Sequence, residues 1–357
     1  MKLVIFEILK MYLVKNFTKL PILLLGSILI LASKSIAQTC CSGGVPTSAN
    51  LGMPTSAVNT LQMSLTYDFN KLNTLKTGTK KEQNAESKRQ THTVMLQLGY
   101  AFTKRFSVDA FIPYVRQTRT SSNFVSTSNI GDVVVLLKYK ILSLNHDATV
   151  LTGAFGVKTP TGRDDYTSSV SGLEDITLSA DLQPGSGAWD LIFWEQFTHV
   201  IGFHPSMSFI SQATYTHRGI NDSFDNGQRT YKFGREFQVM AGLSERVNVG
   251  KLLFDGALTV RYRKAYADRF KINQSQVKKF NELPNTGGQW IFINPSLTYW
   301  ILPDLSYNFN ITLPIFADIT GTQVTPTYRL NMGFFYRLPF KKQKHSSPDN
   351  IINNSMQ

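Results

Sequence analysis

The sequence is poor in cysteine, with only two among its 357 residues, and these two are neighbours, Cys40 and Cys41. Consecutive Cα atoms lie about 3.8 Å apart, below the usual disulfide range, so the pair closes a bridge only with strain. With no other cysteine and no nearby histidine, two thiols make a poor metal site. A lipid anchor is also disfavoured, because neither cysteine directly follows a Leu-x-small triplet. The stretch "SIAQTCCSGGVP" at 35–46 therefore indicates the processed N-terminus of a mature chain.

Long apolar runs are absent beyond residue 37, where none approaches 18 residues, and this excludes a membrane-spanning helix in the mature chain. The main apolar run, 20–32, follows a lysine-rich start and precedes the small-x-small triplet 35–37. These three features predict a secretory signal peptide at 1–37, cut before Gln38. A retained membrane helix is the alternative, but the run is short for a span of about 20 residues.

Acidic residues are few, with 24 Asp and Glu against 37 Lys and Arg, and the net charge is +13. The predicted signal holds five Lys and one Glu, so the mature chain of 357 − 37 = 320 residues carries 13 − 4 = +9. In a secreted protein this excess favours anionic lipid headgroups or acidic solutes as partners, and no nucleic acid is expected.

What the sequence does contain is repeated alternation of apolar and polar residues. In "LQMSLTYDF" (61–69), every second residue from Leu61 to Phe69 is apolar and the residues between them are polar. The pattern recurs in "THTVMLQLGYAF", "GDVVVLLKYKI", "LFDGALTVRYR" and "LSYNFNITL", and it predicts strands with one apolar and one polar face. These runs of about 10–13 residues exceed the usual strand of 5–6 and suit a bilayer crossing of about 9–11.

The connections between these strands alternate strictly between short and long. Short ones fall near 103–105, 143–147, 201–205, 245–250 and 302–304, and long polar ones near 70–90, 117–129, 162–188, 218–231, 264–288 and 317–324. This rhythm predicts an all-β fold, a transmembrane antiparallel outer-membrane β-barrel of about twelve strands over 58–340, with short periplasmic turns and long extracellular loops. A secreted β-sandwich is the alternative, but it needs no such rhythm. We expect 38–57 to be a periplasmic segment or plug and 341–357 to be a disordered tail.

The last predicted strand, "YRLNMGFFYRLPF", carries a more specific signal. Asn331, Gly333, Tyr336 and Leu338 match the polar-x-Gly-x-x-aromatic-x-hydrophobic pattern by which barrel assembly machinery recognises a final strand. The sequence thus predicts that machinery as a partner, together with the outer-membrane lipid.

Three stretches, "GDVVVLLKYKIL", "GVKTPTGRDD" and "LQPGSGAWD", together with "DAFIPYV" at 109–115, resemble the outer-membrane channel family named for the MetA pathway of phenol degradation. The similarity covers most of 58–340. It implies a relative of hydrophobic-solute transporters, which admit aromatic or other small apolar compounds. In such transporters an N-terminal segment can plug the lumen, and that would place Cys40 and Cys41 in or below the pore.

Charged residues on the polar faces are the candidate functional residues. Charge on the lipid face costs about 2–4 kcal/mol at mid-membrane, so period two places these side chains inward. They either line a polar conduit whose basic excess favours anions or pair with each other and fill a narrow barrel. The candidate lumen-lining residues are Asp132, Lys138, Lys140, Glu236, Gln238, Asp255, Arg261, Arg263, Arg329 and Arg337.

These features favour a channel in the outer membrane of a Gram-negative bacterium for passive passage of small, hydrophobic or aromatic solutes, with no cofactor and no metal. A structural or adhesive barrel is the alternative. A barrel phospholipase or esterase is a further alternative, for which His217 and Ser223 would be needed. His217 is followed by Arg218-Gly219 rather than by Ser-Asn-Gly, and it falls on the expected lipid-facing set with Tyr215. We therefore predict no enzymatic activity and no catalytic residue.

Overall fold

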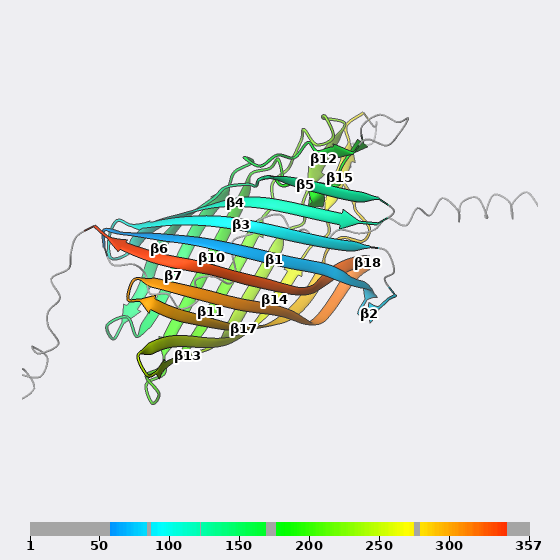
Figure 1. The fold of residues 1–357 in the computed structure, drawn as a ribbon. Coiled ribbons are helices and arrows are strands. Elements are labelled where there is room, and N and C mark those ends of the chain that lie inside the picture. Colours follow the sequence, from blue (N-terminus) through cyan, green and yellow to red (C-terminus); the bar gives the residue numbers. More distant parts are fainter. Residues whose placement is uncertain (1–57, 84–86, 122, 169–175, 275–278, 341–357) are drawn as a thin grey trace, which may run out of the picture. The chain divides into compact units, whose positions relative to one another are not determined.

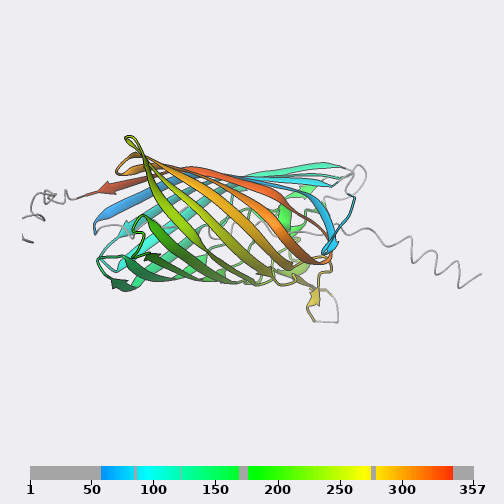
Figure 2. The same cartoon turned by 90° about the horizontal axis from the view of Figure 1, so that it is seen from below.

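The computed structural model describes residues 58–83, 87–121, 123–168, 176–274 and 279–340, all of which belong to one compact unit, Ala37–Gln357. These residues form a closed antiparallel β-barrel with tilted strands (Figures 1 and 2). The barrel strands are β1 (Thr60–Gly78), β3 (Lys88–Ala101), β4 (Phe106–Thr120), β6 (Val134–Leu144), β7 (Thr149–Lys158), β10 (Asp190–Val200), β11 (Met207–His217), β13 (Glu236–Val249), β14 (Leu252–Ala265), β17 (Gly288–Leu302) and β18 (Leu305–Pro339).

Strand β18 closes the barrel by reversing direction. Its first part, from Leu305 to Ile319, pairs antiparallel with β17, and its last part, up to Pro339, pairs antiparallel with β1. Ten antiparallel strands run from β1 to β17 in the sheet, so β1 and β17 point in opposite directions and the two parts of β18 must do so as well. The reversal falls at Gly321, whose φ of +68° lies in the region that glycine tolerates. Eleven named strands thus give a wall of twelve spans.

The two faces of the wall separate as the alternation predicts. On β1, Ser64, Thr66 and Asp68 are buried, whereas Leu65 between them is 54 % exposed. The alternation of buried and exposed residues continues on the other barrel strands, and most residues of the exposed, outward face are apolar. Because a spanning sheet can leave no backbone group unpaired in lipid, closure and an apolar exterior belong together. Within the described ranges, no helix has the length and apolarity needed to cross a membrane.

Short turns gather at one end of the barrel and long connections at the other. Smaller strands lie at the long-loop end, as Figure 1 shows for β5, β12 and β15. They are β2 (Lys80–Lys81), β5 (Phe124–Ile130), β8 (Thr167–Ser168), β9 (Ile176–Thr177), β12 (Arg229–Lys232), β15 (Arg269–Ile272) and β16 (Asn281–Glu282), with one 3-10 turn, η1 (Ala180–Leu182).

Three of the expected loops are largely strand. Residues 70–90 continue β1 and β3, residues 117–129 contain the end of β4 and most of β5, and residues 317–324 form the turn of β18. Cross-strand hydrogen bonds need no apolar face, so they continue where the apolar alternation has ended. The alternation therefore marks the lipid-spanning part of each strand rather than its full length.

Candidate functional site

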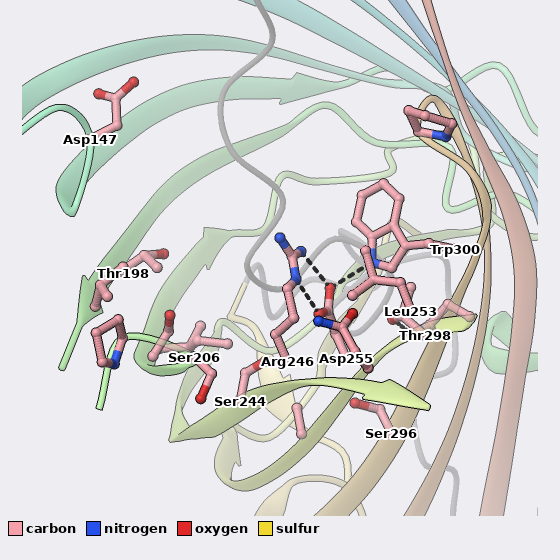
Figure 3. Close-up of a pocket in the computed structure, with 18 of the residues that line it drawn as sticks. Asp147, Thr198, Ser206, Ser244, Arg246, Leu253, Asp255, Ser296, Thr298 and Trp300 are labelled. Atoms are coloured by element: carbon pink, nitrogen blue, oxygen red, sulfur yellow. Dashed lines mark hydrogen bonds and ion pairs between the residues drawn. The ribbon is translucent and has the colours of Figure 1, made fainter. Parts of the chain in front are cut away.

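A cavity of about 880 Å³ opens inside the barrel near the short turns, and we call it the vestibule. Inward residues of seven strands line it, many of them Ser, Thr or Asn. Figure 3 shows its labelled side chains converging from several strands of the wall. The lining also carries three cations, Arg246, Lys251 and Arg337, and the carboxylates Asp147 and Asp255. A volume of this size falls in the range of small-molecule sites, about 300–1,000 Å³.

One side of the vestibule is fixed by the carboxylate of Asp255. Arg246 donates two hydrogen bonds to it, from Nε to Oδ1 at 2.7 Å and from Nη2 to Oδ2 at 2.9 Å (Figure 3). The indole Nε1 of Trp300 also donates to Oδ2, at 2.7 Å. Such a bidentate pair holds the guanidinium in one orientation. The guanidinium groups of Arg246 and Arg337 both lie over the Trp300 ring, at 5.5 and 5.4 Å from its centroid. The vestibule therefore combines positive charge with an aromatic surface.

The opposite end of the lumen is occupied by part of the β7–β10 connection, residues 176–189, which we call the inner loop. Its residues Ala180, Asp181, Leu182 and Gln183 are 4, 2, 1 and 0 % exposed. Asp181 pairs with Arg89, an inward residue of β3. The carbonyl oxygens of Leu182 and Gln183 accept hydrogen bonds from Thr127 of β5 and Gln117 of β4, at 2.6 and 3.2 Å. The inner loop therefore rests against the inner wall.

The three sequence stretches that carry the family resemblance meet at one carboxylate. Asp132 Oδ1 accepts from the backbone N–H of Gly162 at 3.0 Å, and Oδ2 accepts from the N–H and hydroxyl of Ser186 at 2.9 and 2.6 Å. A Cβ on Gly185 would lie 2.2 Å from the carbonyl oxygen of Gly162, so only glycine permits this approach. Asp132 thereby anchors the inner loop to the ends of β6 and β7.

A ladder of buried charges continues from Asp132 around the wall. Lys158 Nζ lies 2.9 Å from both Asp132 Oδ2 and Asp190 Oδ2. Arg218 Nη1 then donates to Asp190 Oδ2 at 2.9 Å, and its Nη2 lies 3.7 Å from Glu236 Oε2. Arg263 completes the ladder with a 2.8 Å bond to Glu236 Oε2. The members of the ladder are Asp132, Lys158, Asp190, Arg218, Glu236 and Arg263. Acids and bases alternate along it, so the ladder carries no net charge.

The middle of the lumen mixes apolar side chains with further cations. Met95, Phe111, Val134, Leu136 and Ile192 form a buried cluster against which Ala154 and Trp194 pack. A second cluster contains Trp290 and Phe292, and the guanidinium groups of Arg263 and Arg261 lie over these rings at 5.0 and 4.7 Å. The alternation alone suggested a uniformly polar inner face, but the inner face also contains these apolar clusters.

The structure places nine of the ten candidate lumen residues on the inner face of barrel strands, and the tenth, Asp132, just before β6 where it contacts the inner loop. Lys138 pairs with Asp109 at 2.8 Å, Arg329 with Asp68 at 2.7 Å, and Gln238 donates to Glu236. Arg337 donates to the carbonyl of Pro303 at 2.6 Å. The vestibule contains Asp255 and Arg337, and the ladder contains Asp132, Glu236 and Arg263.

Lys140 lies near the short turn, where its Nζ is 3.2 Å from Asp147. The Ser143 hydroxyl donates to Asp147 at 2.5 Å, and this bond, with Lys140, holds the pKa of the Asp147 carboxyl below its usual value. Cys40 and Cys41, with the expected plug 38–57, lie outside the described residues, as do the expected signal peptide and C-terminal tail.

His217 ends β11 on the outward face with Tyr215, whereas the neighbouring Thr216 and Arg218 are buried. The hydroxyl of Ser223 donates to Asn221 Oδ1 at 3.0 Å. This geometry does not assemble the serine–histidine pair that a barrel esterase would need.

Several residues that shape the lumen were missed from the sequence. Arg89, Lys158, Asp181, Asp190 and Arg218 sit at strand ends or in the inner loop, where the alternation fades. The stretches "KTPTG" and "QPGSG" were the available signals, because they bring Lys158 and the inner loop to Asp132.

No family model and no curated protein sequence matches the chain. Among solved structures, it is similar to the COG4313 outer membrane channel from Pseudomonas putida F1, with a TM-score of 0.62, 14 % identity, and coverage of 83 % of this chain and 100 % of that one. It also matches the beta domain of the Bordetella autotransporter Brka, with a TM-score of 0.45, 8 % identity, and coverage of 78 % and 99 %. The first likeness confirms the predicted fold class, an outer-membrane β-barrel.

Proposed function

We propose that this protein lies in the outer membrane of a Gram-negative bacterium and lets small solutes diffuse through its barrel. The observation that carries the proposal is the vestibule, a cavity of about 880 Å³ that is lined by inward side chains of the closed wall. Passage needs no cofactor, because the concentration gradient supplies the driving force. The inner loop would then form the constriction between the vestibule and the long-loop end.

The lining indicates which solutes suit this path. Arg246, Lys251 and Arg337 give the vestibule a positive excess over Asp147 and Asp255, which favours anions. Trp300 lines the vestibule itself, and farther in the partly buried Trp194 adds a second aromatic side chain. Small aromatic or other hydrophobic solutes, including those with an acidic group, therefore fit best. The resemblance to the channel family of the MetA phenol pathway points in the same direction.

The test is ion and solute passage through liposomes that contain the folded mature chain. We expect a preference for anions, and the double variant Lys251→Gln/Arg337→Gln should lower it, as read from the reversal potential in a salt gradient. Lys80→Gln is the matched control, because Lys80 lies in the β1–β3 hairpin with its side chain 80 % exposed. A folded protein that passes neither ions nor small aromatic solutes would instead support a structural or adhesive barrel.

Secretion and assembly belong to the same proposal, with removal of 1–37 and recognition of the final strand by barrel assembly machinery. Gly333 on that strand packs closely against β1, since a Cβ there would lie 2.5 Å from Thr66 Cγ2. Asn331 also reaches β1, where its Nδ2 donates to Asp68 at 3.3 Å. Tyr336 and Leu338 face outward. The signal thus coincides with the strand whose pairing with β1 closes the barrel.

A further inference from the structure

Three basic residues lie near one another on the outer face of the barrel, on the adjacent strands β1, β3 and β4. They are Lys71, His92 and Arg116, which we call the rim patch. His92 is the direct cross-strand partner of Arg116, and Phe69, two residues before Lys71, is the partner of His92 on the other side. Direct partners lie about 4.5–5.5 Å apart between Cβ atoms and diagonal ones about 7–8 Å. His92 and Arg116 are direct partners and Lys71 is diagonal to His92, so the three lie within reach of one lipid headgroup.

The rim patch lies at the upper edge of the apolar belt. Toward the short turns, the next outward residue on each strand is Phe69, Val94 or Tyr114. Toward the long loops, the outward residues of β3 and β4 become polar, with Gln90 and Thr118. The patch therefore sits where hydrocarbon gives way to headgroups, in the leaflet on the long-loop side.

Aromatic neighbours contact two of the three side chains of the patch. Lys71 Nζ lies 5.5 Å from the centroid of the Tyr328 ring, and the His92 ring lies 5.0 Å from that of Phe69. The Tyr67 hydroxyl is 2.7 Å from His92 Nδ1, which fixes the orientation of the imidazole. Among the described residues, no carboxylate lies within the 4.0 Å ion-pair distance of these three side chains. The positive charge of Lys71 and Arg116 is thus not neutralised by the protein itself.

We infer that the rim patch binds the phosphate of an anionic lipid headgroup in the outer leaflet. Phosphate oxygens accept hydrogen bonds from the paired N–H groups of arginine and attract the ammonium charge of lysine, and the histidine ring N–H adds a further hydrogen-bond donor. Juxtamembrane clusters of Lys and Arg attract anionic headgroups in this way. The inference rests on the proposed outer-membrane placement but not on solute passage, and it identifies the ligand as a phosphorylated glycolipid of that leaflet.

The experiment measures binding of bisphosphorylated lipid A and of its dephosphorylated form to the folded mature chain in detergent, by native mass spectrometry. Each surface cation contributes a factor of roughly five, so Lys71→Gln/Arg116→Gln should weaken binding of the phosphorylated lipid roughly 25-fold. The single variant Arg116→Gln, at an exposed position, should weaken it roughly fivefold. Lys264→Gln is the control, because Lys264 is an outward lysine near the same end of β14.

Equal binding of both lipids, or unchanged binding by the folded variants, would overturn the inference. Heat-dependent mobility on a gel reports folding independently, and the exposed single variant provides the test if the double variant does not fold. Loss of lipid binding with unchanged solute uptake in liposomes would support the rim patch while leaving the channel proposal untouched. Normal lipid binding by a native chain that passes no solute would count against the channel alone.

Discussion

Replacement of Asp181 by alanine should release the inner loop and open the lumen. Asp181 and Arg89 form an ion pair whose side chains are only 2 and 6 % exposed, and Arg89 also donates to the Asp181 carbonyl and to Gln117. Removing one partner of a buried pair costs about 3–5 kcal/mol, because the other charge remains desolvated. When the inner loop leaves the wall, Arg89 of β3 is exposed to water again, so this cost falls only on the state with the loop bound. At about 1.4 kcal/mol per tenfold, the population of the released loop should rise by at least about a hundredfold.

The assay is liposome swelling with small uncharged and anionic solutes, combined with limited proteolysis of the inner loop. Asp181→Ala should increase both the swelling rate and cleavage within the loop. The double variant Arg89→Met/Asp181→Leu should restore both toward the native values, because a buried ion pair can be replaced by apolar side chains of similar volume at little cost. If proteolysis shows a released loop while permeation stays unchanged, the inner loop is not the constriction and the reasoning fails.

Two further variants test the packing around the inner loop. Lys158→Met leaves Asp132 and Asp190 without their shared cation and should lower the free energy of unfolding by about 3–5 kcal/mol, seen as a lower unfolding midpoint in detergent. Lys140→Met is the control: its partner Asp147 is 48 % exposed, so the loss should be at most about 1 kcal/mol. Equal losses would contradict the burial argument. Gly185→Ala brings a Cβ to 2.2 Å from a backbone oxygen and should displace the loop and raise permeation. Gly202→Ala is the control, because an added Cβ there would have no atom of the described residues within 4 Å, and it should leave permeation unchanged. Unchanged permeation for Gly185→Ala as well would show that the close approach of Gly185 to Gly162 is not required.

The alternation of side chains determined the architecture without help from the fold. A residue such as Leu65 can face only lipid and its neighbours Ser64 and Thr66 only the lumen, because period two and closure leave no other arrangement. The same logic placed Arg261 and Arg329 inward. The rhythm of short and long connections then fixed which end of the barrel carries the loops.

The sequence could not determine which inward charges meet. Asp132 and Lys158 are 26 residues apart, and Arg89 and Asp181 are 92 apart, so their pairing depends on strand register and on the path of the inner loop. The short stretches "KTPTG" and "QPGSG" carried a family resemblance, and only the tertiary structure showed that Gly162 and Gly185 let two loops pack against Asp132.

The sequence by itself thus determined a closed barrel with an apolar exterior, since local periodicity sets the direction of each side chain. Tertiary structure decided that the inner loop enters the lumen, that the buried charges alternate in a ladder, and that an 880 Å³ vestibule remains near the short turns. These features arise from contacts between residues distant in the chain, and such contacts leave no periodic trace in the sequence.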